Sequence, residues 1–341
     1  MRFKAREGDF VEALDGLIFD VKGLVHPPDR IVAYLRYLED PSGDRRRDGK
    51  NYIKVYSLSE REKILRERYP QYLYYDRVFG EYMQGVPTRY VSKLYQPTEK
   101  VRELLEKPRL DIVESQAIKF VKTICDSSDV QLRKIGLSGS ILVNLHRKDS
   151  DIDVIVYGRE DSLSVYEALK RLMDEGCEPI SSYNLEDLKR LYDFRSKDTW
   201  MPLEDFIRIE SRKPMQGKFL GRDFFIRFLL DWDEVNEEYG DRIYIPSGYA
   251  KVKAKVVDNS DAIFTPCRYV IDEVKVLEGT DISPLREIIS FRGRFCDQAR
   301  RGEMVIAQGK VEKVMERDGT EFFRLVLGAK PSDFMISKPA S

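Results

Sequence analysis

The sequence predicts an α+β protein in which a mixed sheet with helices occupies the middle of the chain, flanked on both sides by β-rich domains. Near the two ends, Asp15-Gly16 and Asp318-Gly319 lie between alternating apolar segments, as in tight β-hairpins. The middle instead carries apolar residues at helical spacing, interrupted by short apolar strands. We therefore predict domains at residues 1–97, 98–242 and 243–341.

The composition narrows the class of protein. A chain of 341 residues has room for two or three domains. Charged residues make up 34% with a net charge of -1, which is typical of a thermophile and argues against a basic protein that coats nucleic acid. No apolar run approaches the roughly 20 residues of a membrane span, and no signal peptide is evident, so we expect a cytoplasmic protein without membrane contact. The four cysteines form no Cys-x-x-Cys pair, which disfavours a zinc site.

The first domain is predicted to be mainly β. Strands are expected at 10–14 and 17–21, around the first hairpin turn, and at 31–38. A helix is expected over 60–68, with Ser59 as N-cap and Glu62 completing a capping box. Residues 70–100 have no clear period.

The second and third domains differ in their apolar pattern. Helices are predicted for the segments with helical spacing, 98–127 (in two pieces, split at Lys107-Pro108), 161–175, 185–194 and 202–209. A strongly apolar strand is predicted at 224–230. From about residue 243, apolar and polar residues alternate again in short segments. Short strands with polar faces indicate a small barrel of OB-like composition.

Two acids on one apolar strand are the most informative feature of the middle domain. Asp151 and Asp153 are separated by one residue, so their side chains point to the same face of a sheet. Like charges held this close repel, and a divalent cation is the usual remedy. Upstream, Gly139-Ser140 follows a short apolar strand, and the backbone N–H groups and hydroxyl of such a turn suit a phosphate.

Ser138-Gly139-Ser140, a gap of about ten residues and Asp151-Ile152-Asp153 together resemble the motif of the DNA polymerase beta-like nucleotidyltransferase superfamily. Within this superfamily, the sequence of residues 137–153 resembles that of an archaeal group of predicted nucleotidyltransferases. The resemblance covers roughly residues 110–235. It implies transfer of a nucleoside monophosphate from a nucleoside triphosphate such as ATP to an acceptor hydroxyl. It further implies that Asp151 and Asp153 are catalytic and bind two Mg²⁺ ions, and that Gly139 and Ser140 hold the triphosphate.

This chain departs from the family pattern after the Gly-Ser turn. Many members carry a basic residue in the following helix, but residues 141–144 here are uncharged. The cation that neutralises the phosphates is then expected from the loop before the acids or from the basic cluster around 208–227, and the residues we predict are His146, Arg147, Lys148, Arg222 and Arg227. The alternative is that these residues form a solvated surface paired with nearby acids.

A third carboxylate often lies on a neighbouring strand in the resembled enzymes, as a metal ligand and general base. The strand at 224–230 is the best candidate for that neighbour. Phe225 occupies the matching position, and Asp223 lies two residues earlier on the same face. We predict Asp223 as the third catalytic and metal-binding acid.

The preferred hypothesis is a magnesium-dependent nucleotidyltransferase that acts on an RNA or DNA 3′ end, since two β-rich domains and basic strands suit such an acceptor. A protein or small-molecule hydroxyl is the alternative acceptor. The rival hypothesis is a catalytically degenerate nucleotide- or RNA-binding protein, because the basic residue after Ser140 and an acid at Phe225 are missing.

Overall fold

The computed structural model describes residues 4–176, 178–197, 199–280 and 282–338. The chain forms two compact units. Unit 1 comprises the residues up to 76, 82–181 and 214–239, and unit 2 comprises 77–81, 182–213 and the residues from 240 onward. The described residues form seven α-helices and three sheets, so the predicted α+β class is confirmed. The division into three domains stays a prediction.

The N-terminal sheet of unit 1 has the strand order β4-β5-β3-β2-β1-β8, with β7 paired to β3 and to β6. Its strands are β1 (Phe10–Ala13), β2 (Ile18–Val21), β3 (Arg30–Glu39), β4 (Arg45–Arg47), β5 (Lys50–Lys54), β6 (Leu73–Asp76), β7 (Glu81–Pro87) and β8 (Val91–Tyr95). The predicted hairpin at Asp15-Gly16 is confirmed, since β1 and β2 pair antiparallel across it.

One local prediction for this region is wrong. Helix α1 (Leu58–Arg68) is capped by Ser57, whose side chain accepts from the Glu60 N–H, rather than by Ser59. Residues 70–100 contain β6, β7 and β8 despite their lack of period. These strands are short, and tyrosines stand among their apolar residues. The alternation of apolar and polar residues is therefore too brief to detect in the sequence.

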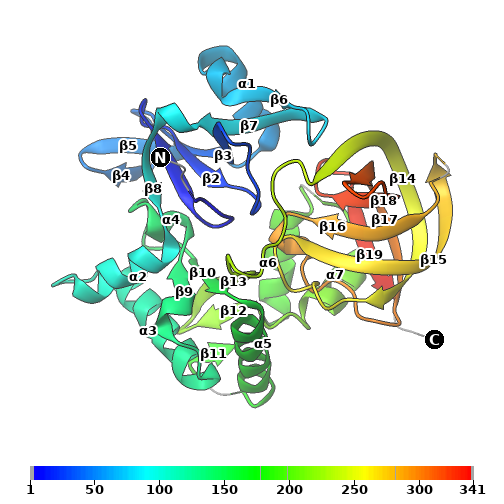
Figure 1. The fold of residues 1–341 in the computed structure, drawn as a ribbon. Helices are drawn as coiled ribbons and strands as arrows, with labels where there is room; N and C mark the ends of the chain where they lie inside the picture. Colours follow the sequence, from blue (N-terminus) through cyan, green and yellow to red (C-terminus); the bar gives the residue numbers. More distant parts are fainter. Residues whose placement is uncertain (1–3, 177, 198, 281, 339–341) are drawn as a thin grey trace. The chain divides into compact units, whose positions relative to one another are not determined.

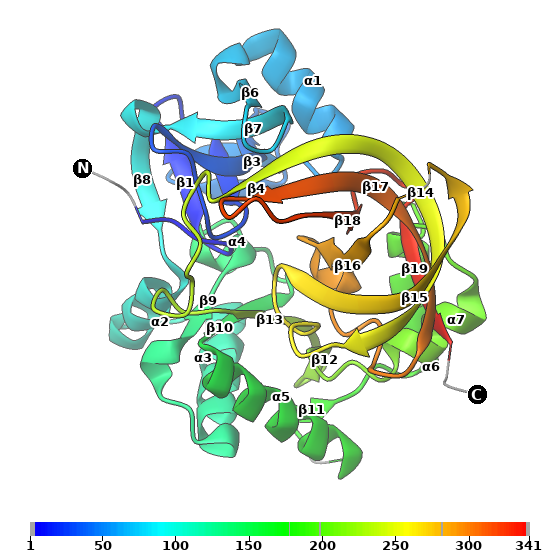
Figure 2. The ribbon, with the colours of Figure 1, turned by 45° about the vertical axis from the view of Figure 1, so that its right-hand side comes forward.

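The two faces of the N-terminal sheet bury different partners. One face packs against Leu65 of α1 around a core that includes Phe19 and Leu35. The opposite face carries Phe10, Ile18, Tyr37 and Tyr52, which pack against Leu142, Val143 and Leu145 at and after α4 (Gly139–Leu142). Figures 1 and 2 both draw α4 beside this sheet. The N-terminal sheet therefore lies directly over the segment that follows the Gly-Ser turn.

The central sheet of unit 1 is mixed, with the order β11-β12-β13-β10-β9. Its strands are β9 (Ile135–Leu137), β10 (Ile152–Tyr157), β11 (Ile180–Ser181), β12 (Gln216–Phe219) and β13 (Arg222–Leu229). Only β10 and β13 pair in parallel. The helices of this region are α2 (Pro97–Glu106), α3 (Ile112–Ser128) and α5 (Arg159–Asp174), and α3 and α5 lie along the sheet in Figure 1.

The two faces of the central sheet differ in what covers them. On the helix face, Phe120 of α3 packs against Phe224, with ring centroids 4.6 Å apart. On the other face, the segment before β1 lies over Ile155 and Tyr157. A Cβ added to Gly8 would lie 2.9 Å from Ile155 Cδ1, and the Arg6 guanidinium lies 3.5 Å from the centroid of the Tyr157 ring. Alternation places the side chain of Asp153 on this second face.

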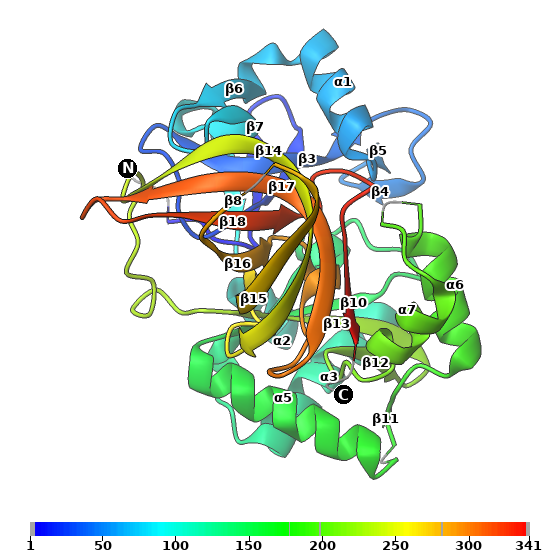
Figure 3. The ribbon, with the colours of Figure 1, turned by 90° about the vertical axis from the view of Figure 1, so that its right-hand side faces the viewer.

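Unit 2 contains a closed barrel of five strands, in which β14 pairs with both β15 and β17. The strands are β14 (Arg242–Asp258), β15 (Cys267–Gly279), β16 (Leu285–Ser290), β17 (Met304–Glu316) and β18 (Glu321–Leu327). The ring runs β14-β15-β16-β18-β17, with β16 and β18 parallel, which is the strand order of an OB-fold. Figure 3 draws β14 and β17 as long, curved, adjacent strands.

Unit 2 also holds two helices and one further strand. These are α6 (Leu185–Arg195), α7 (Leu203–Glu210) and β19 (Phe334–Lys338), which pairs with β17. Apolar residues of α7 pack against Ile336 of β19. None of the helices in the described part of the chain is long and apolar enough to cross a membrane.

Candidate active site

The acid pair lies at the start of β10. Asp151 immediately precedes the strand and is exposed, and Asp153 is its second residue and is half-buried. Among the described residues, neither carboxylate has a hydrogen bond or an ion pair. Burial, and then the charge of Asp151, raise the pKa of Asp153 to about 7. Two carboxylates held together without a protein partner form a site of strong negative potential.

The Gly-Ser turn lies against this pair. Gly139 has a φ of +61°, and a Cβ added there would lie 1.9 Å from Asp153 Oδ2. The Ser138 N–H donates to the Asp153 carbonyl at 2.9 Å and so fixes the turn against β10. Any side chain at residue 139 would occupy the space of the carboxylate, so this position requires glycine. Ser140 is next to it and is 2% exposed.

The parallel register of β10 and β13 places the third predicted acid. Ile152 pairs with Phe224 and Asp153 with Phe225, so Asp223 lies level with Asp151 on the neighbouring strand. Asp223 is exposed and lines a small cavity of about 260 Å³, together with Arg222, Leu220 and three others. An acid level with Asp153 is absent, because that position is Phe225.

Most of the predicted phosphate-binding cations contact other groups. His146 Nε2 lies 2.7 Å from Asp111 Oδ2. Arg147 forms ion pairs with Asp149 and Asp44. Arg222 donates to Gln116 Oε1 at 2.6 Å and to the carbonyls of Lys148 and Ser150 at 2.9 and 2.6 Å. Arg222 therefore holds the loop that precedes the acids, and a phosphate role for these residues stays a prediction.

The cations that act on Asp153 come partly from the N-terminal sheet. Lys54, Arg227 and Arg36 all favour the charged form of its carboxyl and oppose the rise of its pKa. Of these, only Arg227 was among the predicted site residues, and it also pairs with the buried Glu7. Arg36 and Lys54 were missed, because nothing in their local sequence marks them. The only indirect signal was the absence of a basic residue after Ser140.

A second group of possible metal ligands lies at the start of α3. One ligand atom each of Asp111, Glu114 and His146 lie within 4.8 Å of one another. These acids already have partners: Asp111 accepts from the N–H groups of Val113 and Glu114, and Glu114 accepts from Lys107 Nζ at 2.7 and 2.8 Å. The arrangement is a capping box with an ion pair between the exposed Lys107 and the buried Glu114, which accounts for it without a metal.

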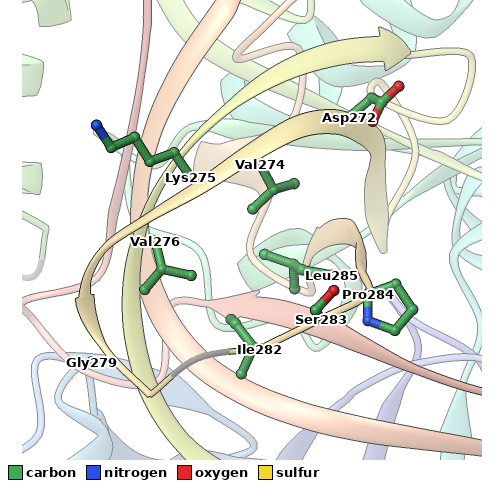
Figure 4. Close-up of a pocket in the computed structure, with 9 residues that line it drawn as sticks. All are labelled: Asp272, Val274, Lys275, Val276, Gly279, Ile282, Ser283, Pro284 and Leu285. Carbon is green, nitrogen blue, oxygen red and sulfur yellow. The ribbon is translucent and has the colours of Figure 1, made fainter.

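A larger cavity of about 680 Å³ lies on the barrel of unit 2, between β15 and the segment that leads into β16 (Figure 4). Val274, Val276, Ile282 and Leu285 give it an apolar lining, with Asp272 and Lys275 at its margin. It contains none of the predicted site residues.

Comparison with known proteins identifies the family. Residues 117–216, which include the Gly-Ser turn and both acids, match the family model for the nucleotidyltransferase domain. The chain is also 31% identical over 340 residues to an uncharacterized protein, MJ1086, of the archaeon Methanocaldococcus jannaschii, covering 97% of both chains. The chain belongs to the nucleotidyltransferase family. No solved structure matches it significantly.

The family model and the archaeal relative match different parts of the chain. The nucleotidyltransferase domain model ends before β13, so Asp223 and Arg227 lie outside it. It also excludes the N-terminal sheet and the barrel. The match to the archaeal relative, by contrast, extends over all three sheets. The similarity of this chain to the archaeal protein therefore includes both units.

Proposed function

We propose that this protein is a magnesium-dependent nucleotidyltransferase that adds a nucleoside monophosphate to an acceptor hydroxyl. One observation carries the proposal: Asp153 lies against Gly139, Asp151 precedes it by two residues, neither carboxylate has a protein partner in the described chain, and the pKa of Asp153 is raised. In the reaction, the acceptor oxygen bonds to the α-phosphorus, the bond between the α-phosphorus and its bridging oxygen breaks, and pyrophosphate leaves. The hydroxyl proton passes to a base.

The donor set fits Mg²⁺. Carboxylate oxygens are the ligands that this ion prefers, and neither Asp151 nor Asp153 forms an ion pair in the described chain, so their oxygens are available to it. When bound, the metal neutralises phosphate charge and lowers the pKa of the acceptor hydroxyl. Asp151 and Asp153 would hold it, with Asp223 as the third ligand.

The residues of the chain supply position and proton transfer. Gly139 lets the backbone approach the acids, so that a phosphate held at the Gly139-Ser140 turn lies next to the metal ligands. We assign the acceptance of the hydroxyl proton to Asp223, because it is exposed and level with Asp151.

The acceptor is proposed to be an RNA or DNA 3′ end. The barrel of unit 2 has the strand order of an OB-fold, and OB-folds bind oligonucleotides in many proteins. The support for this acceptor comes from the fold alone. A protein or small-molecule hydroxyl is tested in parallel.

The direct test is transfer of label from each α-labelled nucleoside triphosphate, with Mg²⁺, to RNA, DNA or protein. Asp151→Asn and Asp153→Asn are each expected to lower the rate at least about 100-fold, since both remove charge that the metal needs. Asp149→Asn is the matched control, because Asp149 is an exposed acid two residues away that pairs with Arg147. A rate that is unchanged in both acid variants would sink the proposal.

The rival function is nucleotide or RNA binding without turnover, and the phenylalanine level with Asp153 is the observation that favours it. Calorimetry separates the two. A transferase binds triphosphate more tightly with Mg²⁺ and loses this dependence in Asp153→Asn, whereas a binding protein holds nucleotide equally well with or without the metal.

A further inference from the structure

We infer that the N-terminal sheet completes the nucleotide site, with Arg36 and Lys54 binding the triphosphate in place of the basic residue that is missing after the Gly-Ser turn. The inference rests on the proposed function. It assigns the recognition of the β- and γ-phosphates to a sheet that lies outside the nucleotidyltransferase domain match.

Strand register places Lys54 on the face of the N-terminal sheet that packs over the segment after the Gly-Ser turn. Lys54 of β5 pairs with Tyr37 of β3. The side chains of Lys54 and Tyr37 therefore lie on the same sheet face, the one that packs over residues 142–145. Between β2 and β3 the register shifts, since Ile18 pairs with Tyr37 but Phe19 pairs with Leu35. The extra residue of this β-bulge is Arg36. A β-bulge changes the direction of the side chain of its extra residue. The charge of Arg36 acts on both Lys54 and Asp153.

These two cations form no ion pair in the described chain, although the charge of Arg36 stabilises the carboxylate of Asp20, which itself pairs with Lys22. Neither Arg36 nor Lys54 has a carboxylate within ion-pair distance in the described ranges of the chain. Arg36 makes a long hydrogen bond, 3.4 Å, to the Val55 carbonyl. Both groups lie beside the same ring, that of Tyr56, at 5.3 and 5.1 Å from its centroid. Two half-buried positive charges that are close together and without an ion-pair partner favour an anion.

The electrostatics of the two cations match a metal-bound triphosphate. Burial and the neighbouring Arg36 lower the pKa of Lys54 to about 8, and Asp151 and Asp153 only partly offset them. Neither cation forms an ion pair with Asp151 or Asp153 in the described part of the chain, so both stay available to a ligand. A triphosphate whose metal is held by Asp151 and Asp153 would place its remaining phosphate oxygens toward Arg36 and Lys54, and each charge-assisted hydrogen bond there would strengthen binding.

The test measures binding by calorimetry, with inorganic triphosphate and a non-hydrolysable ATP analogue as probes, each with Mg²⁺, and with AMP as a third probe. Lys54→Met and Arg36→Gln are expected to weaken both triphosphate probes about tenfold to a hundredfold and AMP by less than about threefold. Lys50→Met is the matched control, because Lys50 is on the same strand but is exposed and pairs with Glu39. Lys54→Met removes a half-buried charge, so it is expected to fold, which circular dichroism and the thermal midpoint verify.

The outcomes separate this inference from the proposed function. If wild-type protein binds the triphosphate probes and neither Lys54→Met nor Arg36→Gln weakens them, the inference is overturned while label transfer can still stand. If the variants weaken triphosphate but label transfer does not depend on Asp151 and Asp153, the anion site is supported and the proposed transferase fails.

Discussion

At the scale of single residues, the site is defined by a carboxylate and a glycine that occupy adjoining space. Asp153 has a raised pKa because it is buried beside Asp151, and Gly139 is the residue whose backbone touches it. The left-handed φ and the missing side chain at residue 139 are separate requirements. The cost of the left-handed φ and the cost of the clash with Asp153 can therefore be separated by replacing two different glycines.

Gly139→Ala is expected to lower the free energy of unfolding by at least about 1 kcal/mol more than Gly176→Ala, and to abolish nucleotide binding. Both glycines have nearly the same φ, +61° and +64°, but a Cβ at Gly176 meets nothing within 4 Å. The difference therefore isolates the clash with Asp153. Urea unfolding of the two variants provides the measurement, and equal losses would show that the contact with Asp153 is unimportant.

Asp9 gives a pH-dependent prediction. It is 1% exposed, and burial raises its pKa from 3.8 to about 7 in the folded protein. The folded state thus binds this proton more tightly than the unfolded state, so its contribution to stability is complete below pH 3.8 and is lost as the pH rises through about 7. Asn does not titrate, so Asp9→Asn does not lose this contribution over this pH range.

The stability of Asp9→Asn relative to wild type is expected to rise between about pH 4 and pH 7, by at most about 1.4 kcal/mol per pH unit, and to be constant above about pH 8. Denaturant unfolding at a series of pH values provides the measurement. A difference that is independent of pH would contradict the raised pKa.

At the scale of elements, the start of α3 shows how a cluster of possible metal ligands serves a structural purpose. Asp111 and Glu114 satisfy N–H groups at the end of the helix in a capping box, and Lys107 compensates the buried Glu114. His146 joins the cluster through Asp111 and so ties the loop before the acid pair to this helix.

If the cluster is a cap, Asp111→Ser is expected to leave stability within about 0.5 kcal/mol of wild type, whereas Asp111→Ala loses about 1 kcal/mol, because serine also caps helices. Thermal unfolding with and without a chelator provides the measurement. A metal site would instead be damaged equally by both substitutions, and the chelator would destabilise wild type alone.

At the scale of the whole molecule, unit 1 joins two sheets through one apolar contact surface. Tyr37 and Tyr52 of the N-terminal sheet bury Leu142, Val143 and Leu145. Polar contacts reinforce this surface: Arg45 Nη1 donates to the Leu145 carbonyl at 2.6 Å, and Ser138 Oγ donates to the Gly8 carbonyl at 2.6 Å. The segment after the Gly-Ser turn thus belongs to the apolar core of the N-terminal sheet, while the helix that leads into it contacts β10 of the central sheet.

Leu145→Ala is expected to destabilise unit 1 by about 2–5 kcal/mol, because Leu145 is fully buried against the N-terminal sheet. Hydrogen exchange is expected to increase in β2, β3 and β5 as well as in β9 and β10. The control is Leu163→Ala, since Leu163 is 44% exposed. Faster exchange in only one of the two sheets would mean that they fold independently.

Much of the secondary structure could be predicted from local pattern. Helices α2 and α3 with the break at Lys107-Pro108, the hairpins at Asp15-Gly16 and Asp318-Gly319, and strand β13 all follow from periodicity and turn residues. The cap of α1 was misplaced by two residues, because Ser57 and Ser59 both have suitable hydroxyls. The tyrosine-rich strands β6 to β8 gave no readable alternation.

Local sequence was enough to predict the family and the fold class and to single out the acid pair as a candidate site, because Gly139-Ser140 and Asp151-x-Asp153 are motifs whose geometry follows from one turn and one strand. Which cations face that pair depends instead on the folded chain. The positions of Arg36 and Lys54 depend on a β-bulge, a cross-strand pair and the packing of the N-terminal sheet over residues 142–145, and such long-range contacts leave no trace in the residues adjacent to them.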